Sequence, residues 1–281
     1  MEHAKPAMLI FMLLTVGPVL YFIFRAKRGA SIRVRRIAGI DAIDEGIGRS
    51  VELGRPISFT TALTPVTPTL YACLGVLRHI ARKAAVFSAK LLVPSSDPEV
   101  LALTDATLQN AYREEKRYSQ YDPTSIRYLS REQFAFASGY MGIIHREKVG
   151  SAFLFGTFAA ESLILAEAGQ QVGAIQVAAT VSAEQIPFFI TACDYTLLGE
   201  ELYAASAYLS KDPVQTGSLR GQDFGKLLIL LLVVLGAIES TYLGSGTDYH
   251  PEEPKPTHIQ QWMELSWNDL VKKFSAAEPS S

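Results

Sequence analysis

Cysteine is scarce in this chain, and the spacings typical of metal sites are missing. The 281 residues include only two cysteines, Cys73 and Cys193, and five histidines. The histidines have no metal-ligand spacing with cysteines or carboxylates, so the sequence predicts no metal site. We interpret the two cysteines as buried, reduced thiols of a cytoplasmic domain rather than as a disulfide.

Signatures of catalysis and nucleotide binding are also absent. No glycine-rich dinucleotide fingerprint follows an apolar segment, and the chain has neither a GxxxxGK[ST] phosphate loop nor a GxSxG nucleophile elbow. Tyr112 and Lys116 have the Tyr-x-x-x-Lys spacing of short-chain dehydrogenases, but any surface helix can place these residue types four apart. We therefore expect no cofactor and favour a role other than catalysis.

Basic charge is not in excess outside one short segment. The net charge is −2, and residues 37–223 hold fifteen Lys and Arg against twenty Asp and Glu. This balance provides no basic face for nucleic acid, so we do not expect a nucleic-acid partner.

A long segment near the beginning of the chain is apolar and carries no charge. Residues 7–24 carry no charge, and a helix of eighteen residues approaches the roughly 30 Å thickness of a bilayer's hydrocarbon core. A basic flank follows, whereas a cleaved signal peptide has its positive charges before the apolar run. We predict a transmembrane helix of an inner or plasma membrane, with the N-terminus outside and the next domain in the cytoplasm. The lipid bilayer is then a partner. The flank consists of Arg25, Lys27, Arg28, Arg33, Arg35 and Arg36, within an anchor region of residues 1–36.

The middle of the chain alternates between apolar segments and helical patterns. After a connecting helix in residues 37–55, we predict strands at residues 57–63, 89–94, 126–129, 151–158 and 174–180, with a last helical stretch at residues 182–209. Such alternation places helices on both faces of a parallel sheet. The predicted fold class is α/β, a doubly wound, Rossmann-like cytoplasmic domain of about five parallel strands in residues 56–223. Ser130 with Gln133, and Ser182 with Gln185, have the spacing of capping boxes at helix starts.

Two other segments are apolar enough to be considered as membrane helices. Residues 149–168 are one, although Glu161 and Glu167 disfavour that alternative. Residues 227–238 are short for a span, but Phe224 and Tyr242 extend them and Lys226 can snorkel to the interface. We predict a second transmembrane helix at residues 224–243, the alternative being a buried or interfacial segment. Residues 244–281 would then lie outside as a proline-rich spacer and an amphipathic helix with Trp262 and Trp267 on its apolar face.

Polar residues follow the predicted strands, where parallel sheets bind ligands beside the N-termini of helices. The same residue types serve as helix caps, and Asp97 and Glu161 would repel an anionic ligand. This candidate strand-end rim consists of Thr60, Thr61, Ser95, Ser96, Asp97, Thr157, Glu161, Thr180 and Ser182.

One stretch carries a family resemblance. The sequence GTFAAESLILAEAGQQVGAIQ begins at Gly156. Over residues 156–223 the chain resembles a family of bacterial and archaeal membrane-anchored proteins of unknown function. The resemblance implies a membrane location and assigns no catalytic residues.

Two functional hypotheses follow from these patterns. The first is a structural or assembly protein, whose cytoplasmic domain associates with itself as a homo-oligomer or with a larger membrane complex. Its candidate interface residues come from the apolar runs at residues 163–165 and 187–190 and from the predicted tail helix. A helix that is apolar on most sides needs another protein surface to cover it in addition to the sheet. The second is a small-ligand-binding or catalytic domain that uses the strand-end rim. The interface candidates are Leu163, Ile164, Leu165, Phe188, Phe189, Trp262 and Trp267.

Overall fold

A computed structural model describes residues 6–29, 38–210 and 212–244 of the chain. The chain divides into two compact units, residues 33–212 and residues 1–32 together with 213–281. Each unit is considered by itself. Trp262 and Trp267, with the whole expected tail helix, lie outside the described residues, as do Arg33, Arg35 and Arg36.

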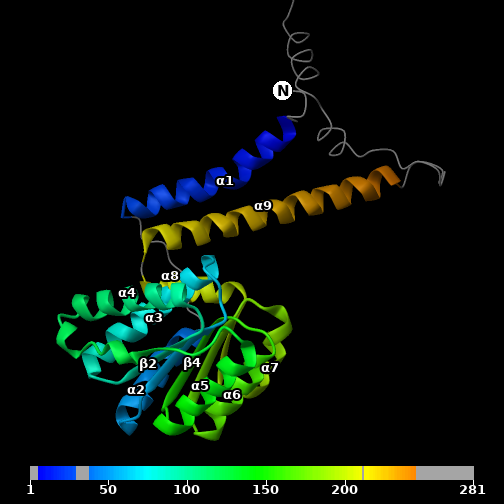
Figure 1. Cartoon of the computed structure of the whole chain (residues 1–281). Coiled ribbons are helices and arrows are strands. Elements are labelled where there is room, and N and C mark those ends of the chain that lie inside the picture. Colours follow the sequence, from blue (N-terminus) through cyan, green and yellow to red (C-terminus); the bar gives the residue numbers. More distant parts are fainter. Residues whose placement is uncertain (1–5, 30–37, 211, 245–281) are drawn as a thin grey trace, which may run out of the picture. The chain divides into compact units, whose positions relative to one another are not determined.

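A six-stranded parallel sheet forms the centre of the larger unit (Figure 1). Its order is β3-β2-β1-β4-β5-β6, so the chain starts in the middle, builds one half, and returns to build the other. This arrangement confirms the predicted doubly wound α/β fold. The strands are β1 (Ile57–Ala62), β2 (Leu91–Ser95), β3 (Ile126–Tyr128), β4 (Ser151–Thr157), β5 (Ile175–Thr180) and β6 (Tyr195–Leu198).

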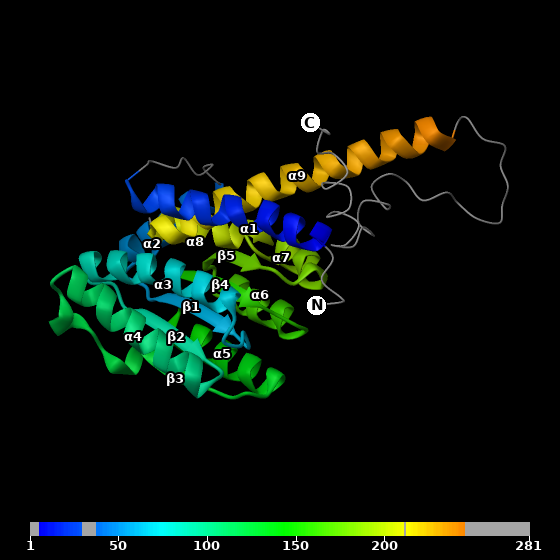
Figure 2. The same cartoon turned by 90° about the horizontal axis from the view of Figure 1, so that it is seen from above.

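Helices cover both faces of the sheet (Figure 2). Side chains alternate along β4, where Phe153 and Phe155 join one apolar core and Leu154 joins the other. Because both faces are buried, the middle of β4 is apolar on both sides rather than alternating with polar residues. The first core lies under α2 (Ala38–Leu53), α3 (Pro68–Phe87), α4 (Pro98–Glu114) and α8 (Glu200–Ser210), and the second under α5 (Gln133–Glu147), α6 (Glu161–Gln171) and α7 (Ile186–Ala192).

The chain between residues 182 and 209 differs from the single helical stretch that the sequence predicts. It forms the short helix α7, then β6 at the edge of the sheet, then α8. The carboxylate of Asp194 accepts a hydrogen bond from the backbone N–H of Gln176 at 2.7 Å, which ties the start of β6 to β5. Gly199 ends the strand with a φ of +55°, a conformation that glycine adopts without strain.

The two predicted capping boxes are wrong in detail. Ser130 Oγ accepts from the backbone N–H of Glu132, and the side chain of Gln133 points to a different helix. Ser182 makes no side-chain cap, and Gln185 also bonds to another helix. Residues 149–168 form β4 and α6, which excludes the alternative of a membrane helix there.

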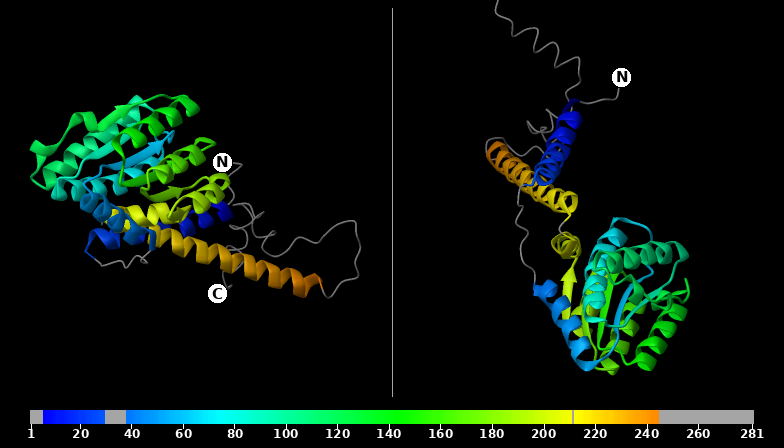
Figure 3. Two further views of the ribbon diagram at one scale, coloured as in Figure 1. Left: turned by 90° about the horizontal axis from the view of Figure 1, so that it is seen from below. Right: turned by 90° about the vertical axis from the view of Figure 1, so that its left-hand side faces the viewer.

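In its described residues, the smaller unit has two helices, α1 (Pro6–Lys27) and α9 (Pro213–Gly244), which contact each other. Both are long and apolar enough to cross a membrane, over Met8–Lys27 and Pro213–Glu239. Thus α9 begins well before the expected start of the second span at residue 224. The right-hand view of Figure 3 shows the two helices crossing.

Glycines set the distance between these two helices. A Cβ atom on Gly217 would lie 2.6 Å from the Cα of Ile23, and one on Gly221 would be similarly too close to the Cα of Val19. As residue numbers rise by four along α9 they fall by four along α1, so the helices run antiparallel. Small residues that allow backbones to approach are characteristic of packed membrane helices.

Candidate functional site

The carboxyl edge of the sheet is where a doubly wound fold places its ligand sites. The chain reverses its winding between β1 and β4, which pair in the middle of the sheet. The helices that follow them, α3 and α6, pack on opposite faces. Thr60 and Thr61 lie in β1, Thr157 ends β4, and Glu161 starts α6, so these four predicted residues surround the switch point. Ser95, Ser96 and Asp97 follow at the end of β2, and Thr180 and Ser182 at the end of β5.

Glu161 is the one fully buried carboxylate among these predicted residues. Its Oε2 accepts a hydrogen bond from Gln133 Nε2 at 2.6 Å, and its Oε1 accepts from the backbone N–H of Ala159 at 3.1 Å. On the next residue, Ser162 Oγ donates to Gln185 Oε1 at 2.7 Å. Hydrogen bonds of this kind offset part of the cost of burying a charged or polar group. They also tie the start of α6 to the starts of α5 and of the turn before α7.

A threonine cluster closes the gap between the β1 and β4 ends. Thr64 Oγ1 donates to the carbonyl of Thr61 at 2.5 Å and accepts from the backbone N–H of Thr157 at 2.8 Å. Gly156 has a φ of +149°, and a Cβ atom there would collide with Thr64 Oγ1. The hydroxyl of Thr64 therefore links the loop after β1 to the end of β4.

Other side chains of the strand-end rim also form hydrogen bonds within the protein. Thr60 Oγ1 donates to the carbonyl of Pro94 at 3.0 Å, and Ser96 Oγ donates to the carbonyl of Ala62 at 2.5 Å. Thr180 Oγ1 accepts from the backbone N–H of Ser182 at 3.0 Å. The first of these hydrogen bonds joins β1 to β2, and the other two hold the loops that leave the strands.

Asp97 is the N-cap of α4. Its Oδ1 accepts from the backbone N–H of Glu99 at 2.8 Å, and its Oδ2 lies 2.9 Å from Arg131 Nη2. Ser95 Oγ donates to the carbonyl of Asp97 at 3.3 Å. Asp97 and Ser95 therefore stabilise the start of α4, where the sequence indicates a helix cap.

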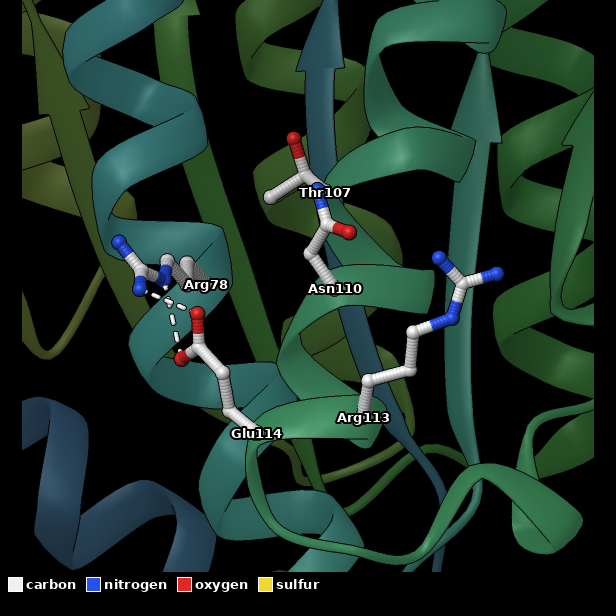
Figure 4. A pocket seen from close by; sticks show the side chains of 5 residues that line it. All are labelled: Arg78, Thr107, Asn110, Arg113 and Glu114. Atoms are coloured by element: carbon white, nitrogen blue, oxygen red, sulfur yellow. Dashed lines mark hydrogen bonds and ion pairs between the residues drawn. The ribbon is translucent and has the colours of Figure 1, made fainter.

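An open groove of about 370 Å³ lies between α3 and α4 (Figure 4). Its charges are largely neutralised within the protein. Arg78 and Glu114 point toward each other and form a two-bond ion pair, with Arg78 Nε 3.2 Å from Glu114 Oε2. Arg113 points away from that pair and lies 4.8 Å over the ring of Tyr118. The groove is lined by helix side chains rather than by strand ends, and the sequence does not predict it.

The two thiols have environments that suppress reactivity. Both cysteines are free, and Cys73 is buried while Cys193 is half-buried. Burial raises the pKa of Cys73, and burial with the nearby charge of Asp194 raises the pKa of Cys193 to about 12. Thiols with raised pKa values are poor nucleophiles and poor metal ligands. Within the described part of the chain, no group of three or more His, Cys, Asp or Glu could hold a metal ion.

The two apolar runs of the predicted interface each divide between core and surface. In α6, Leu163 is 45% exposed, Ile164 is half-buried and Leu165 is buried. In α7, Phe188 is 44% exposed, whereas Phe189 is buried with its ring centre 4.9 Å from that of Phe158. Leu165 and Phe189 therefore belong to the core.

Two further exposed apolar side chains lie on these and a neighbouring helix. Phe134 of α5 and Ile190 of α7 are exposed like Leu163 and Phe188. Gln133 bonds to Glu161, and Ser162 bonds to Gln185, so the starts of α5, α6 and α7 lie together. We name Phe134, Leu163, Phe188 and Ile190 the apolar rim. The sequence predicts two of these four, Leu163 and Phe188, as interface residues. The spacing of apolar residues in α5 does not indicate that Phe134 is exposed.

The basic flank is described only in part. Arg25 and Lys27 lie in the last turn of α1, and Arg28 follows it; all three are exposed.

Taken together, these features define a doubly wound, parallel α/β domain in a chain that also has two apolar helices able to cross a membrane. Comparison of the sequence with protein families identifies its group. The chain belongs to the family described as Domain of unknown function (DUF6754), whose model matches residues 1–248. No curated protein and no solved structure matches the chain.

Proposed function

We propose that this chain is a membrane-anchored assembly protein. Helices α1 and α9 hold it in the bilayer, and the α/β domain lies in the cytoplasm and associates with a second copy or with a larger membrane complex. The N-terminus and the tail after residue 244 lie on the opposite side of the membrane from the cytoplasm. This arrangement follows from the basic flank after α1, which stays on the cytoplasmic side.

The apolar rim is the observation that carries the proposal. Four large apolar side chains are exposed on the neighbouring helices α5, α6 and α7. Single exposed apolar residues are ordinary, but several on adjoining helices offer apolar area that another protein can cover. Covering one such side chain contributes about 1.5–3 kcal/mol, so four of them offset much of the cost of association.

The hydrogen bonds at the carboxyl edge support a structural role for that edge. Thr60, Thr64, Ser96 and Thr180 bond to backbone groups at the ends of the strands and in the loops that follow. The carboxylate of Glu161 accepts two hydrogen bonds from the protein. A ligand would have to displace some of these contacts before it could use the same groups.

The test of the assembly function compares charge substitutions inside and outside the apolar rim. Leu163→Glu and Phe188→Glu should each lower the mass of the solubilised full chain, measured by light scattering, while its circular dichroism remains that of an α/β protein. Val86→Glu is the matched control, because Val86 on α3 is also 44% exposed but lies outside the rim. If all three variants have the same mass as the unmodified chain, the rim is not the interface.

A small-ligand-binding or catalytic role is the second candidate. It is favoured by one observation, the buried carboxylate of Glu161 at the switch point between β1 and β4. Thermal denaturation of the full chain with nucleotides and with divalent cations separates the two functions. A ligand at 100 times its Kd stabilises a protein by about 2.7 kcal/mol, so a binder raises the Tm by several degrees. The assembly proposal expects no such rise.

A further inference from the structure

The side of α9 turned away from α1 carries charges of both signs. Gly217 and Gly221 mark the side that contacts α1. Arg220, Asp223 and Lys226 follow one another at intervals of three residues, and all three are exposed. At about 100° of rotation per residue, this spacing puts them on one stripe centred on Asp223, which lies about 140° around the helix from the middle of the two glycines.

The contacts between the helices give the depth of these charges relative to α1. Gly217 lies against Ile23 and Gly221 against Val19, so the same antiparallel register places Asp223 level with Gly17. The uncharged run of α1 ends at Phe24. Seven residues of helix separate Gly17 from Phe24, a length of roughly 10 Å. When α1 spans the bilayer, the carboxylate of Asp223 therefore lies within the hydrocarbon region.

A carboxylate at that depth is unfavourable in contact with lipid. Long Lys and Arg side chains can extend to the interface, but the side chain of Asp is too short to do so. Charged residues in membrane helices accordingly face protein or water and pair with one another.

We propose that this side of α9 is an interface with a second copy of the chain inside the membrane. Arg220 of each copy pairs with Asp223 of the other copy. A two-fold axis along the membrane normal brings the same surface of both copies together at the same depth, as a self-complementary interface requires. The opposite charges of Arg220 and Asp223, one helical turn apart, make this surface complementary to itself. The inference rests on the proposed membrane crossing of α1 and α9, but not on the apolar rim.

A charge exchange between two copies tests this pairing. Two differently tagged full-length chains are expressed together, and the fraction that co-purifies from solubilised membranes is measured. Arg220→Asp in both copies should reduce this fraction at least 5-fold, and so should Asp223→Arg in both, because like charges then face each other. With Arg220→Asp in one copy and Asp223→Arg in the other, every contact is again between opposite charges, and co-purification should return.

Two further variants separate pairing from simple insertion into the membrane. Gln222→Ala changes an exposed residue at the same depth on a neighbouring side of α9 without adding a charge, and it should leave co-purification unchanged. The double variant Arg220→Leu with Asp223→Leu removes both charges and inserts readily, yet it should also lose co-purification. If the mixed charge-exchange pair recovers no better than its two parents, or if the double Leu variant pairs as well as the unmodified chain, the proposal is wrong. Alkaline extraction of all membranes reports separately on whether the chain is anchored at all.

Discussion

Gly221 of α9 lies directly against the backbone of Val19 in α1, so that even a methyl group would not fit between the two helices. Gly217 has the same relationship to Ile23, one turn away. Two glycines thus set the closest approach of the helix pair that we propose as the membrane anchor. Dispersion contacts between closely packed backbones are a main source of stability for helices in lipid, where the hydrophobic effect does not drive them together.

Alanine substitution of these glycines should loosen the helix pair. We expect Gly217→Ala and Gly221→Ala each to destabilise it by about 1–3 kcal/mol, the usual cost of forcing an extra methyl group into a packed site. The measurement is the rate at which α9 is cleaved by protease in detergent, which should rise. Gly17→Ala and Gly225→Ala are matched controls, since a Cβ atom at either position meets nothing within 4 Å. Equal effects at all four positions would contradict the close contact.

Removing the amide that holds Glu161 should destabilise the α/β domain. Gln133→Ala leaves a buried carboxylate oxygen without its donor, and we expect a loss of about 1–3 kcal/mol in the free energy of unfolding. Gln171→Ala removes a comparable amide-to-carboxylate bond, to Glu167, on the exposed surface, where the loss should stay below about 0.5 kcal/mol. Denaturant titration of both variants makes the comparison. Similar losses would mean that the bond to Glu161 has no special structural role.

Both thiols should resist alkylation in the folded protein. Because the pKa of Cys193 is raised to about 12, its thiolate is scarce at pH 8, and Cys73 is both buried and raised in pKa. We expect iodoacetamide to react at least about 100-fold more slowly than with an ordinary free cysteine, whose pKa is near 8.5. Mass spectrometry of native and denatured protein gives the two rates. The rate for Cys193 should rise with pH well beyond pH 9, and a plateau near pH 9 would contradict the raised pKa.

Reporter fusions should place the α/β domain in the cytoplasm. The positions after Gly54 and Gly173 suit this test, because both glycines have positive φ values and a Cβ atom at either meets nothing within 4 Å. Fusions at both sites should score as cytoplasmic, and a fusion at the C-terminus should score as external. An external score at Gly54 or Gly173 would reverse the orientation derived from the basic flank.

Sequence patterns predict most of the fold because the underlying signals are local. Five strands and the first apolar helix follow from runs of apolar residues and from breaks at Pro and Gly. The sequence does not predict β6, since Tyr195–Leu198 is only four residues long and lies between two helices. At this length, periodicity does not distinguish a strand from a continuing helix.

The contacts at the carboxyl edge could not be predicted from spacing. Gln133 and Gln185 have the positions of capping-box residues, but their side chains bond to Glu161 and Ser162, 28 and 23 residues away in the sequence. The division of each apolar run is also a tertiary effect, because Leu165 and Phe189 face the core while Leu163 and Phe188 face outward. Likewise, the register of Gly217 and Gly221 against α1 depends on how two distant helices pack.

The number of chains in the intact particle tests the assembly function most directly. The measurement is the mass of the unmodified full-length chain, solubilised in detergent at micromolar concentration, with the detergent contribution subtracted. We expect two or more copies per particle, or a defined complex with another membrane protein. A monomer from which no partner co-purifies would contradict the proposed function.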